Sequence, residues 1–143
     1  MEKAFRYESE IQAIPSIRND LETLAGDWGL PGSELRQIIL IIEELFSNTI
    51  RFAYEDELEH QVEIRISMNN GTVTIEMIDD GMPFNPMDYN PALRTDPAAR
   101  DDGGMGLTLI KAFTDSFEYH RVDERNHLVI RKIIRNKSES DDQ

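Results

Sequence analysis

A long amphipathic helix is the clearest element in the pattern of hydrophobic and polar positions. Between Glu34 and about Tyr54, apolar side chains recur with a period of 3.6 residues and form one broad stripe. The residues of the stripe are Leu35, Ile38, Ile39, Ile42, Leu45, Phe46, Thr49, Ile50 and Ala53. The polar residues on the opposite side are Gln37, Glu44, Asn48 and Arg51. Ser33 follows the Pro31-Gly32 break and is predicted to cap the start of this helix.

Two strands with strictly alternating hydrophobic residues follow the helix. The alternating positions are Val62, Ile64, Ile66 and Met68 in the first strand, and Val73, Ile75 and Met77 in the second. The intervening Asn69-Asn70-Gly71 is typical of a tight hairpin turn. A weaker alternation at Phe5–Glu8 predicts a first strand, and two closing strands are predicted at Phe117–Val122 and Leu128–Ile134.

The remaining pattern predicts two shorter helices and one long loop. One amphipathic helix begins near Pro15 and ends near Gly26 or Gly29, and another covers about Gly106–Asp115. The stretch Met82–Asp102 has no clear period and contains four of the six prolines. A loop of about twenty residues inside a compact domain is usually a lid over a ligand, and the alternative is a flexible insertion.

Composition narrows the class of protein. A chain of 143 residues can bury a core as one domain, and the absence of cysteine excludes disulfides and cysteine-based metal sites. The net charge of −13 argues against a nucleic-acid-binding protein, because a phosphate backbone needs a cationic surface. We expect no membrane span, no signal peptide and a cytoplasmic location. The domain is expected to cover residues 1–136, followed by a disordered tail at residues 137–143.

Glu44 and Asn48 are the first residues that could carry chemistry. Because they lie four positions apart on the predicted helix, their side chains point the same way. The amide oxygen of Asn48 is a suitable ligand for Mg²⁺, and the carboxylate of Glu44 could take a proton from an attacking hydroxyl. Ile41, on nearly the same face, would partly desolvate Glu44. Taken alone, such a pair is also typical of an ordinary solvated helix face.

Asp79 and Gly81 lie at the end of the second hairpin strand. A carboxylate there can accept a hydrogen bond from an exocyclic amine such as adenine N6. Gly81 allows the backbone to turn sharply and to approach a flat base. A simple Asp-Gly turn after a strand is the structural alternative. Asp80 is expected to point to the other side and is given no role.

The glycine cluster Gly103-Gly104-Met105-Gly106 opens the last predicted helix. The first N–H groups of a helix are unpaired and bind anions, and glycines allow phosphates to approach them. The cluster is neither a Walker A loop nor a regular dinucleotide fingerprint, and a flexible hinge is the alternative. Arg100, three residues earlier, could reach a γ-phosphate and stabilise charge during transfer, and Arg94 is the weaker candidate.

With these three segments in place, the chain resembles the Bergerat ATP-binding fold of type II topoisomerases, heat-shock chaperones, sensor histidine kinases and mismatch-repair ATPases. It looks most similar to the small anti-sigma-factor serine/threonine kinases of bacterial partner-switching systems, over about residues 5–132. The motifs that carry the resemblance are Glu44-Leu45-Phe46-Ser47-Asn48-Thr49, Asp79-Asp80-Gly81-Met82-Pro83-Phe84-Asn85-Pro86 and Gly103-Gly104-Met105-Gly106-Leu107. The resemblance implies an α+β two-layer sandwich, in which helices cover one face of a mixed, mostly antiparallel sheet and a lid closes over ATP.

The resemblance also implies roles for individual residues. Asn48 would bind Mg²⁺, and Glu44 would be the general base. Asp79 would bind adenine, and Gly81 would shape the base pocket. The residues that would line the phosphates are Gly103, Gly104, Gly106 and Leu107.

One position departs from the resemblance. Relatives often carry a threonine in the last strand that helps to hold adenine through water. Here that region reads Asn126-His127-Leu128-Val129 and has no threonine. Either Asn126 or His127 would have to substitute, or the contact would be absent.

The implied function is that of a protein serine/threonine kinase that uses ATP and Mg²⁺. It would phosphorylate an anti-sigma-factor antagonist, a small domain of the sulfate-transporter/anti-sigma antagonist type, and sequester that protein or a sigma factor. A homodimer is also implied. The sequence pattern does not identify its interface, for which our hypothesis is the first strand and helix. The alternatives are a non-catalytic module whose affinity for a partner is set by nucleotide, a detached catalytic domain of a sensor histidine kinase, and an isolated ATPase.

Overall fold

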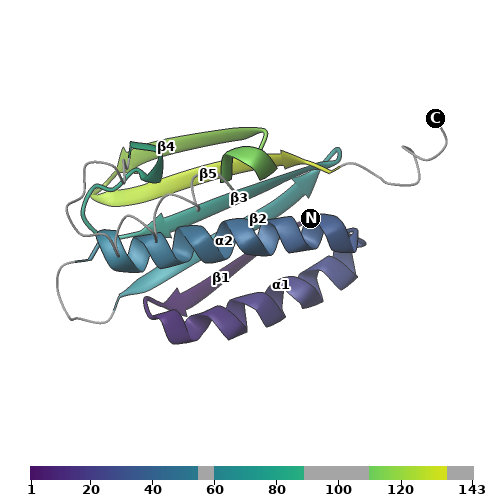
Figure 1. Cartoon of the computed structure of the whole chain (residues 1–143), viewed down its shortest axis with the longest axis horizontal. Helices are drawn as coiled ribbons and strands as arrows, with labels where there is room; N and C mark the ends of the chain where they lie inside the picture. Colours follow the sequence, from purple (N-terminus) through teal and green to yellow (C-terminus); the bar gives the residue numbers. More distant parts are fainter. Residues whose placement is uncertain (55–59, 89–109, 135–143) are drawn as a thin grey trace.

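The described residues of the chain fold into a sheet of five strands and two long helices (Figure 1). The structure is a computed structural model that describes residues 1–54, 60–88 and 110–134. The strands are β1 (Glu2–Glu8), β2 (Gln61–Asn69), β3 (Thr72–Asp79), β4 (Ser116–Val122) and β5 (Arg125–Ile133). The helices are α1 (Ile14–Trp28) and α2 (Gly32–Phe52), with short 3-10 turns η1 (Ile11–Ala13) and η2 (Pro86–Asp88). Residues 110–113 are also helical.

The sheet is open and has the strand order β1-β2-β3-β5-β4. Every strand pairing among the described residues is antiparallel. The predicted hairpin turn is confirmed, because Asn70 and Gly71 both adopt positive φ angles, of 52° and 76°. The strand expected to begin at Leu128 begins three residues earlier, at Arg125, directly after a second tight turn.

The core lies between the sheet and the two helices, which run side by side across one face (Figure 1). The inward side chains of the central strands are Val62, Ile64, Ile66, Val73, Ile75, Met77, Leu128 and Ile130, and all are buried. Alternation places them on one face, where they pack against the apolar stripe of α2. The predicted α+β architecture with helices on one face is therefore confirmed. None of the described helices is long and apolar enough to cross a membrane.

The start of α2 differs from the prediction that Ser33 is its cap. Pro31 occupies the capping position with an extended backbone (φ −61°, ψ 146°), and no side chain caps the helix. The carbonyl of Pro31 accepts the first helical hydrogen bond, from Leu35 N at 3.0 Å. Ser33 therefore lies inside the first turn, because Pro31 already has the extended conformation that precedes a helix. By contrast, α1 ends as predicted at Gly29, which has a left-handed conformation (φ 68°).

A buried ion pair fixes the end of the sheet that is farther from the candidate site. Lys132 Nζ of β5 lies 3.2 Å from Glu34 Oε2 in the first turn of α2, and both residues are buried. The same ammonium donates to the carbonyl of Phe113 at 3.1 Å. Lys132 thereby ties residues 110–113 to the sheet and to α2. The predicted lid is described only for residues 82–88, and the predicted tail lies outside the described residues.

Candidate functional site

Asn48 lies in a buried part of α2, contrary to the expectation that it faces away from the apolar stripe. It is only 4% exposed, and its Oδ1 has no hydrogen-bond partner among the residues that the structure describes. An unpaired buried amide oxygen is unfavourable by about 1–3 kcal/mol, so a ligand that binds it would relieve that penalty. A Mg²⁺ ion, which prefers oxygen ligands, fits this atom.

Glu44 lies one turn before Asn48 and is half-buried. Its Oε1 is shielded from solvent, and Ile41, on nearly the same face, is fully buried. The expected partial desolvation of Glu44 is therefore present in the structure. A carboxylate oxygen shielded from bulk water can accept a proton from a hydroxyl group bound next to it.

The C-terminal half of α2 packs directly against the end of β3. Thr49 Oγ1 lies 4.0 Å from the sulfur of Met77, and Met82 N donates to the carbonyl of Ala53 at 2.7 Å. Thr49 follows Asn48 in the chain, and Met77 lies two residues before Asp79. Both contacts therefore bring Asn48 and Asp79 to the same end of the molecule.

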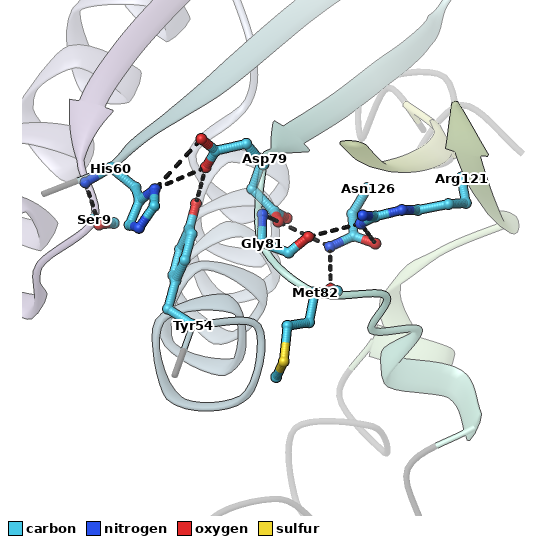
Figure 2. Close-up of polar contacts among 9 residues, drawn as sticks. Ser9, Tyr54, His60, Asp79, Gly81, Met82, Arg121 and Asn126 are labelled. Atoms are coloured by element: carbon cyan, nitrogen blue, oxygen red, sulfur yellow. Dashed lines mark hydrogen bonds and ion pairs between the residues drawn. The ribbon is translucent and has the colours of Figure 1, made fainter. Parts of the chain in front are cut away.

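Asp79 is the last residue of β3 and is only 3% exposed. Its Oδ1 accepts hydrogen bonds from Gly81 N at 2.9 Å and from Asn126 Nδ2 at 2.8 Å (Figure 2). Burial raises the pKa of the Asp79 carboxyl, whereas these two hydrogen bonds oppose the shift. Asp79 is thus a buried hydrogen-bond acceptor with a fixed orientation at the end of β3. A group that binds an exocyclic amine must be such an acceptor.

Asn126, rather than His127, is the residue of the last strand that contacts Asp79. The register of β3 and β5 places Asn126 directly opposite Asp79, and Asn126 is 1% exposed. His127 points to the other face of the sheet, where its Nδ1 lies 3.0 Å from Glu76 Oε1. The alternation at positions 126, 128 and 130, all of which are buried, could have indicated that Asn126 points into the core. It does not reveal that Asn126 lies opposite Asp79, because that depends on the register of the two strands.

Gly81 allows an unusually close approach between two segments. A Cβ atom at Gly81 would lie 2.5 Å from the carbonyl oxygen of Ala53 and 2.7 Å from its Cβ. Real Cβ atoms do not approach backbone atoms so closely. Glycine is therefore required here by the packing of the turn on the end of α2, in addition to any contact with a base.

We expect Gly81→Ala to lower the free energy of unfolding by at least ~2 kcal/mol, because the added methyl group forces the turn away from Ala53. Urea denaturation monitored by circular dichroism would measure the loss. Gly26→Ala is the matched control, since a Cβ at Gly26 meets no atom within 4 Å and alanine favours the helix α1. Equal unfolding midpoints for the two variants would contradict the expectation.

Asp80 has a structural role that the sequence did not indicate. Its Oδ1 accepts a hydrogen bond from Tyr54 OH at 3.1 Å and lies 3.1 Å from His60 Nδ1. The Tyr54 and His60 rings stack with their centroids 4.3 Å apart (Figure 2). Burial, reinforced by the charges of Asp79 and Asp80, raises the pKa of Tyr54. These contacts join the end of α2 and the start of β2 to the residue that follows Asp79.

A hollow of about 370 Å³ opens on the face of the sheet opposite the helices. Its lining residues are Arg6, His60, Gln61, Glu63, Arg65, Ile78, Asp79, Asp80 and Arg125. Neither Glu44 nor Asn48 contributes to it, and two of its arginines are paired with Glu63, at 3.2 and 2.8 Å. The hollow is therefore distinct from the Glu44 and Asn48 pair on α2.

The predicted phosphate-binding residues lie outside the described part of the chain. They are Arg94, Arg100, Gly103, Gly104, Gly106 and Leu107. Their contribution to the site remains a prediction from the sequence.

Comparison with known families agrees with the geometry. Residues 7–132 match the family described as the histidine kinase-like ATPase domain. The chain belongs to this family. The matched range of this histidine kinase-like ATPase includes Glu44, Asn48, Asp79 and Asn126.

Among individual relatives, the chain is similar to anti-sigma F factors. It is 29% identical to that of Oceanobacillus iheyensis over 93 residues, which are 64% of each chain. It is 27% identical to that of Bacillus subtilis over 84 residues, which are 57% of each chain. The match thus spans less than two thirds of the length of these relatives. Together with the family match, these similarities confirm the resemblance to anti-sigma-factor kinases.

Solved structures agree on the fold. The crystal structure of the RsbU and RsbW domains of a Mycobacterium tuberculosis protein aligns with a TM-score of 0.66 at 14% identity, covering 94% of this chain and 32% of that one. The histidine kinase domain of a blue-light-activated Erythrobacter litoralis protein aligns with a TM-score of 0.54 at 15% identity, covering 87% and 60%. At such identities the likeness concerns the fold alone.

Proposed function

We propose that the chain is an ATP-dependent protein serine/threonine kinase of the anti-sigma-factor type. The observation that carries this proposal is the geometry of α2, where a partly desolvated Glu44 lies one turn from the buried amide oxygen of Asn48, which has no hydrogen-bond partner among the described residues. A nucleotide-binding module needs an acceptor for the base and a ligand for the metal, whereas a kinase also needs a base for the attacking hydroxyl. The position of Glu44 beside Asn48 supports its assignment as that base.

Asn48 would hold Mg²⁺ through Oδ1. When bound, the ion neutralises charge on the triphosphate and orients it. Asp79 would accept a hydrogen bond from the adenine amine, because its buried carboxylate is held in one orientation by Asn126 and Gly81. Arg100 would stabilise the transferring phosphoryl group, and the residues that would bind phosphate oxygens are Gly103, Gly104, Gly106 and Leu107.

In the transfer step, the oxygen of a serine or threonine hydroxyl forms a bond to the γ-phosphorus. The bond from that phosphorus to the bridging oxygen of the β-phosphate breaks, and ADP leaves. The hydroxyl proton passes to the carboxylate of Glu44. Glu44 later returns this proton to solvent, so no further reactant is needed.

The substrate we propose is an anti-sigma-factor antagonist, a small domain of the sulfate-transporter/anti-sigma antagonist type. The similarity to anti-sigma F factors supports this partner class. The same similarity supports sequestration of the antagonist or of a sigma factor. We also propose a homodimer that uses α1 and β1, which is an edge strand of the sheet (Figure 1).

The proposal is tested by incubating the purified chain with Mg·[γ-³²P]ATP and a candidate antagonist domain from the same organism. We expect label on one serine or threonine of the antagonist, located by mass spectrometry. The antagonist with that residue changed to alanine is the control and should stay unlabelled. A chain that binds ATP but labels none of the candidate antagonists would contradict the kinase proposal.

A non-catalytic, nucleotide-controlled binding module is the second candidate. It is favoured by the base site, because the side chain of Asn126 already has five hydrogen-bond contacts within the protein and offers no second contact to adenine. In such a module, release of the partner would depend on Asn48 but not on Glu44. The Glu44 variant treated in the Discussion separates the two functions.

A further inference from the structure

The amide nitrogen of Asn126 uses both of its hydrogen atoms within the protein. Nδ2 donates to Asp79 Oδ1 at 2.8 Å and to the carbonyl of Met82 at 2.7 Å (Figure 2). An amide nitrogen has two N–H groups, so no donor remains for a ligand. Asn126 therefore cannot donate to a bound nucleotide without losing one of these contacts.

The amide oxygen of Asn126 is equally engaged. It accepts from Tyr119 OH at 2.6 Å, from Arg121 Nη1 at 3.1 Å and from the backbone N of Phe84 at 3.2 Å. A guanidinium and a backbone N–H can only donate, and the carbonyl of Met82 can only accept. The surroundings thus determine which end of the amide is the donor, and they hold the side chain in one orientation.

This orientation determines what Asp79 can offer to a ligand. Oδ1 of Asp79 receives both available donors, from Gly81 and Asn126. The hydrogen bonds of Asp79 to the described residues all involve Oδ1, which leaves Oδ2 as the acceptor for an incoming amine.

The same amide also holds the segment that enters the predicted lid. Asn126 binds the carbonyl of Met82 and the N–H of Phe84. The ring of Phe84 in turn lies 5.4 Å from that of Phe52, at the end of α2. One buried side chain thus links the carboxylate at the end of β3 to the first residues beyond it.

We propose that Asn126 is the positioning residue for adenine recognition: it directs Oδ2 of Asp79 toward the base amine and fixes residues 82–84 beside it, without contacting the nucleotide. This inference rests on the proposed function only in that the ligand is an adenine nucleotide. A single carboxylate, that of Asp79, would then discriminate between bases, and Asn126 of the neighbouring strand β5 would orient it. The residue that replaces the expected threonine would act through Asp79 rather than through a water at the base.

The test compares two nucleotides that differ only at the base amine. Calorimetry with Mg·ATP and with the Mg complex of purine riboside triphosphate, which lacks the 6-amino group, gives their affinity ratio. We expect the wild-type chain to prefer ATP by about tenfold, the effect of one hydrogen bond to a charged acceptor. Asn126→Leu, which has a similar volume but no donor, should bring the ratio close to one while the affinity for the amine-free nucleotide changes little.

Asn126→Asp is the second variant, and it tests the same donor if Asn126→Leu does not fold. It places a second carboxylate next to Asp79, and two such groups share one proton. While the proton is present it restores the donor, so the preference for ATP should be present at low pH and decrease as the pH is raised and the pair loses its proton. The other charged or titratable groups around the pair are Asp80, Arg121, Tyr54 and Tyr119, and all are unchanged in the variant.

His127→Ala is the matched control, because His127 is adjacent in β5 but contacts Glu76 on the other face. It should keep the wild-type ratio. When Asp79→Asn is already present, adding Asn126→Leu should not lower the affinity ratio of ATP to the amine-free nucleotide any further, because Asn126 acts through Asp79.

Several results would overturn the inference. They are an unchanged ratio in folded Asn126 variants, an equal loss of affinity for both nucleotides, and a wild-type chain without preference for ATP. A wild-type chain that binds neither nucleotide would overturn the kinase proposal as well. A chain that shows the expected ratios but transfers no phosphate would overturn the kinase proposal alone.

Discussion

Glu44→Gln should reduce phosphoryl transfer to the partner by about 10²–10⁴-fold, the usual contribution of a general base. Glutamine has nearly the same shape but cannot take a proton from the attacking hydroxyl. Because glutamine fills the space of the half-buried Glu44, the substitution leaves Asn48 and its metal-binding oxygen in place. The affinity for Mg·ATP should therefore change by less than about threefold.

Glu43→Gln is the matched control for this experiment. Glu43 is the preceding residue, and its carboxylate pairs with Arg18 of α1 at 2.6 Å, away from Asn48. It should keep the wild-type rate, because an ion pair of this kind contributes little to stability. Single-turnover labelling of the antagonist measures both variants. A Glu44→Gln variant that transfers phosphate at the wild-type rate would exclude Glu44 as the base and favour the binding module.

Asn48→Ala should weaken binding of Mg·ATP by at least about 100-fold, because it removes a direct metal ligand and loss of an outer-shell partner alone already costs about 10–100-fold. The free energy of unfolding should change by less than about 1 kcal/mol. Deleting a buried side chain normally destabilises, but here it also removes an oxygen that has no hydrogen-bond partner among the described residues. At this position the substitution should therefore lower the affinity for Mg·ATP without a comparable loss of folding stability.

Calorimetry with and without Mg²⁺ makes this prediction specific. Without the metal, wild type and Asn48→Ala should bind ATP equally, because the amide oxygen acts only through the ion. Asn19→Ala is the control, since Asn19 is exposed on α1. It should leave nucleotide binding unchanged and stabilise the helix slightly. Wild-type affinity for Mg·ATP in Asn48→Ala would remove Asn48 from the site.

The elements that were predicted well depend on neighbouring residues in the chain. The period of 3.6 in α2 and the period of 2 in β2 and β3 are local patterns, and the Asn70-Gly71 turn needs only the positive φ angles that these residues adopt easily. The second turn was harder to recognise. Asp123 and Glu124 also have positive φ angles, of 51° and 60°, although no glycine marks the position. The strand after it was therefore predicted to begin too late.

In the candidate site, too, the features set by local spacing were predicted and those set by distant segments were not. The spacing of Glu44 and Asn48 predicted that they share one side of the helix, but not that Asn48 is buried. The buried width of a helix depends on what packs against it, and this information lies in other segments. Likewise, Asp80 meets Tyr54 and His60 only because the ends of α2 and β3 lie beside the start of β2.

The sequence by itself determined that the chain mixes helices and strands, the acid–amide pair of α2 and the acid at the end of β3, because each follows from periodicity or spacing within one segment. The arrangement of these elements in two layers came from the family resemblance. Only the tertiary structure decided that Gly81 must be glycine, through its approach to Ala53, and that Asn126 rather than His127 lies opposite Asp79. Strand register is a long-range property, since it is set by the pairing of segments almost fifty residues apart. A shift of one residue would have turned His127 inward and given the site a different chemistry.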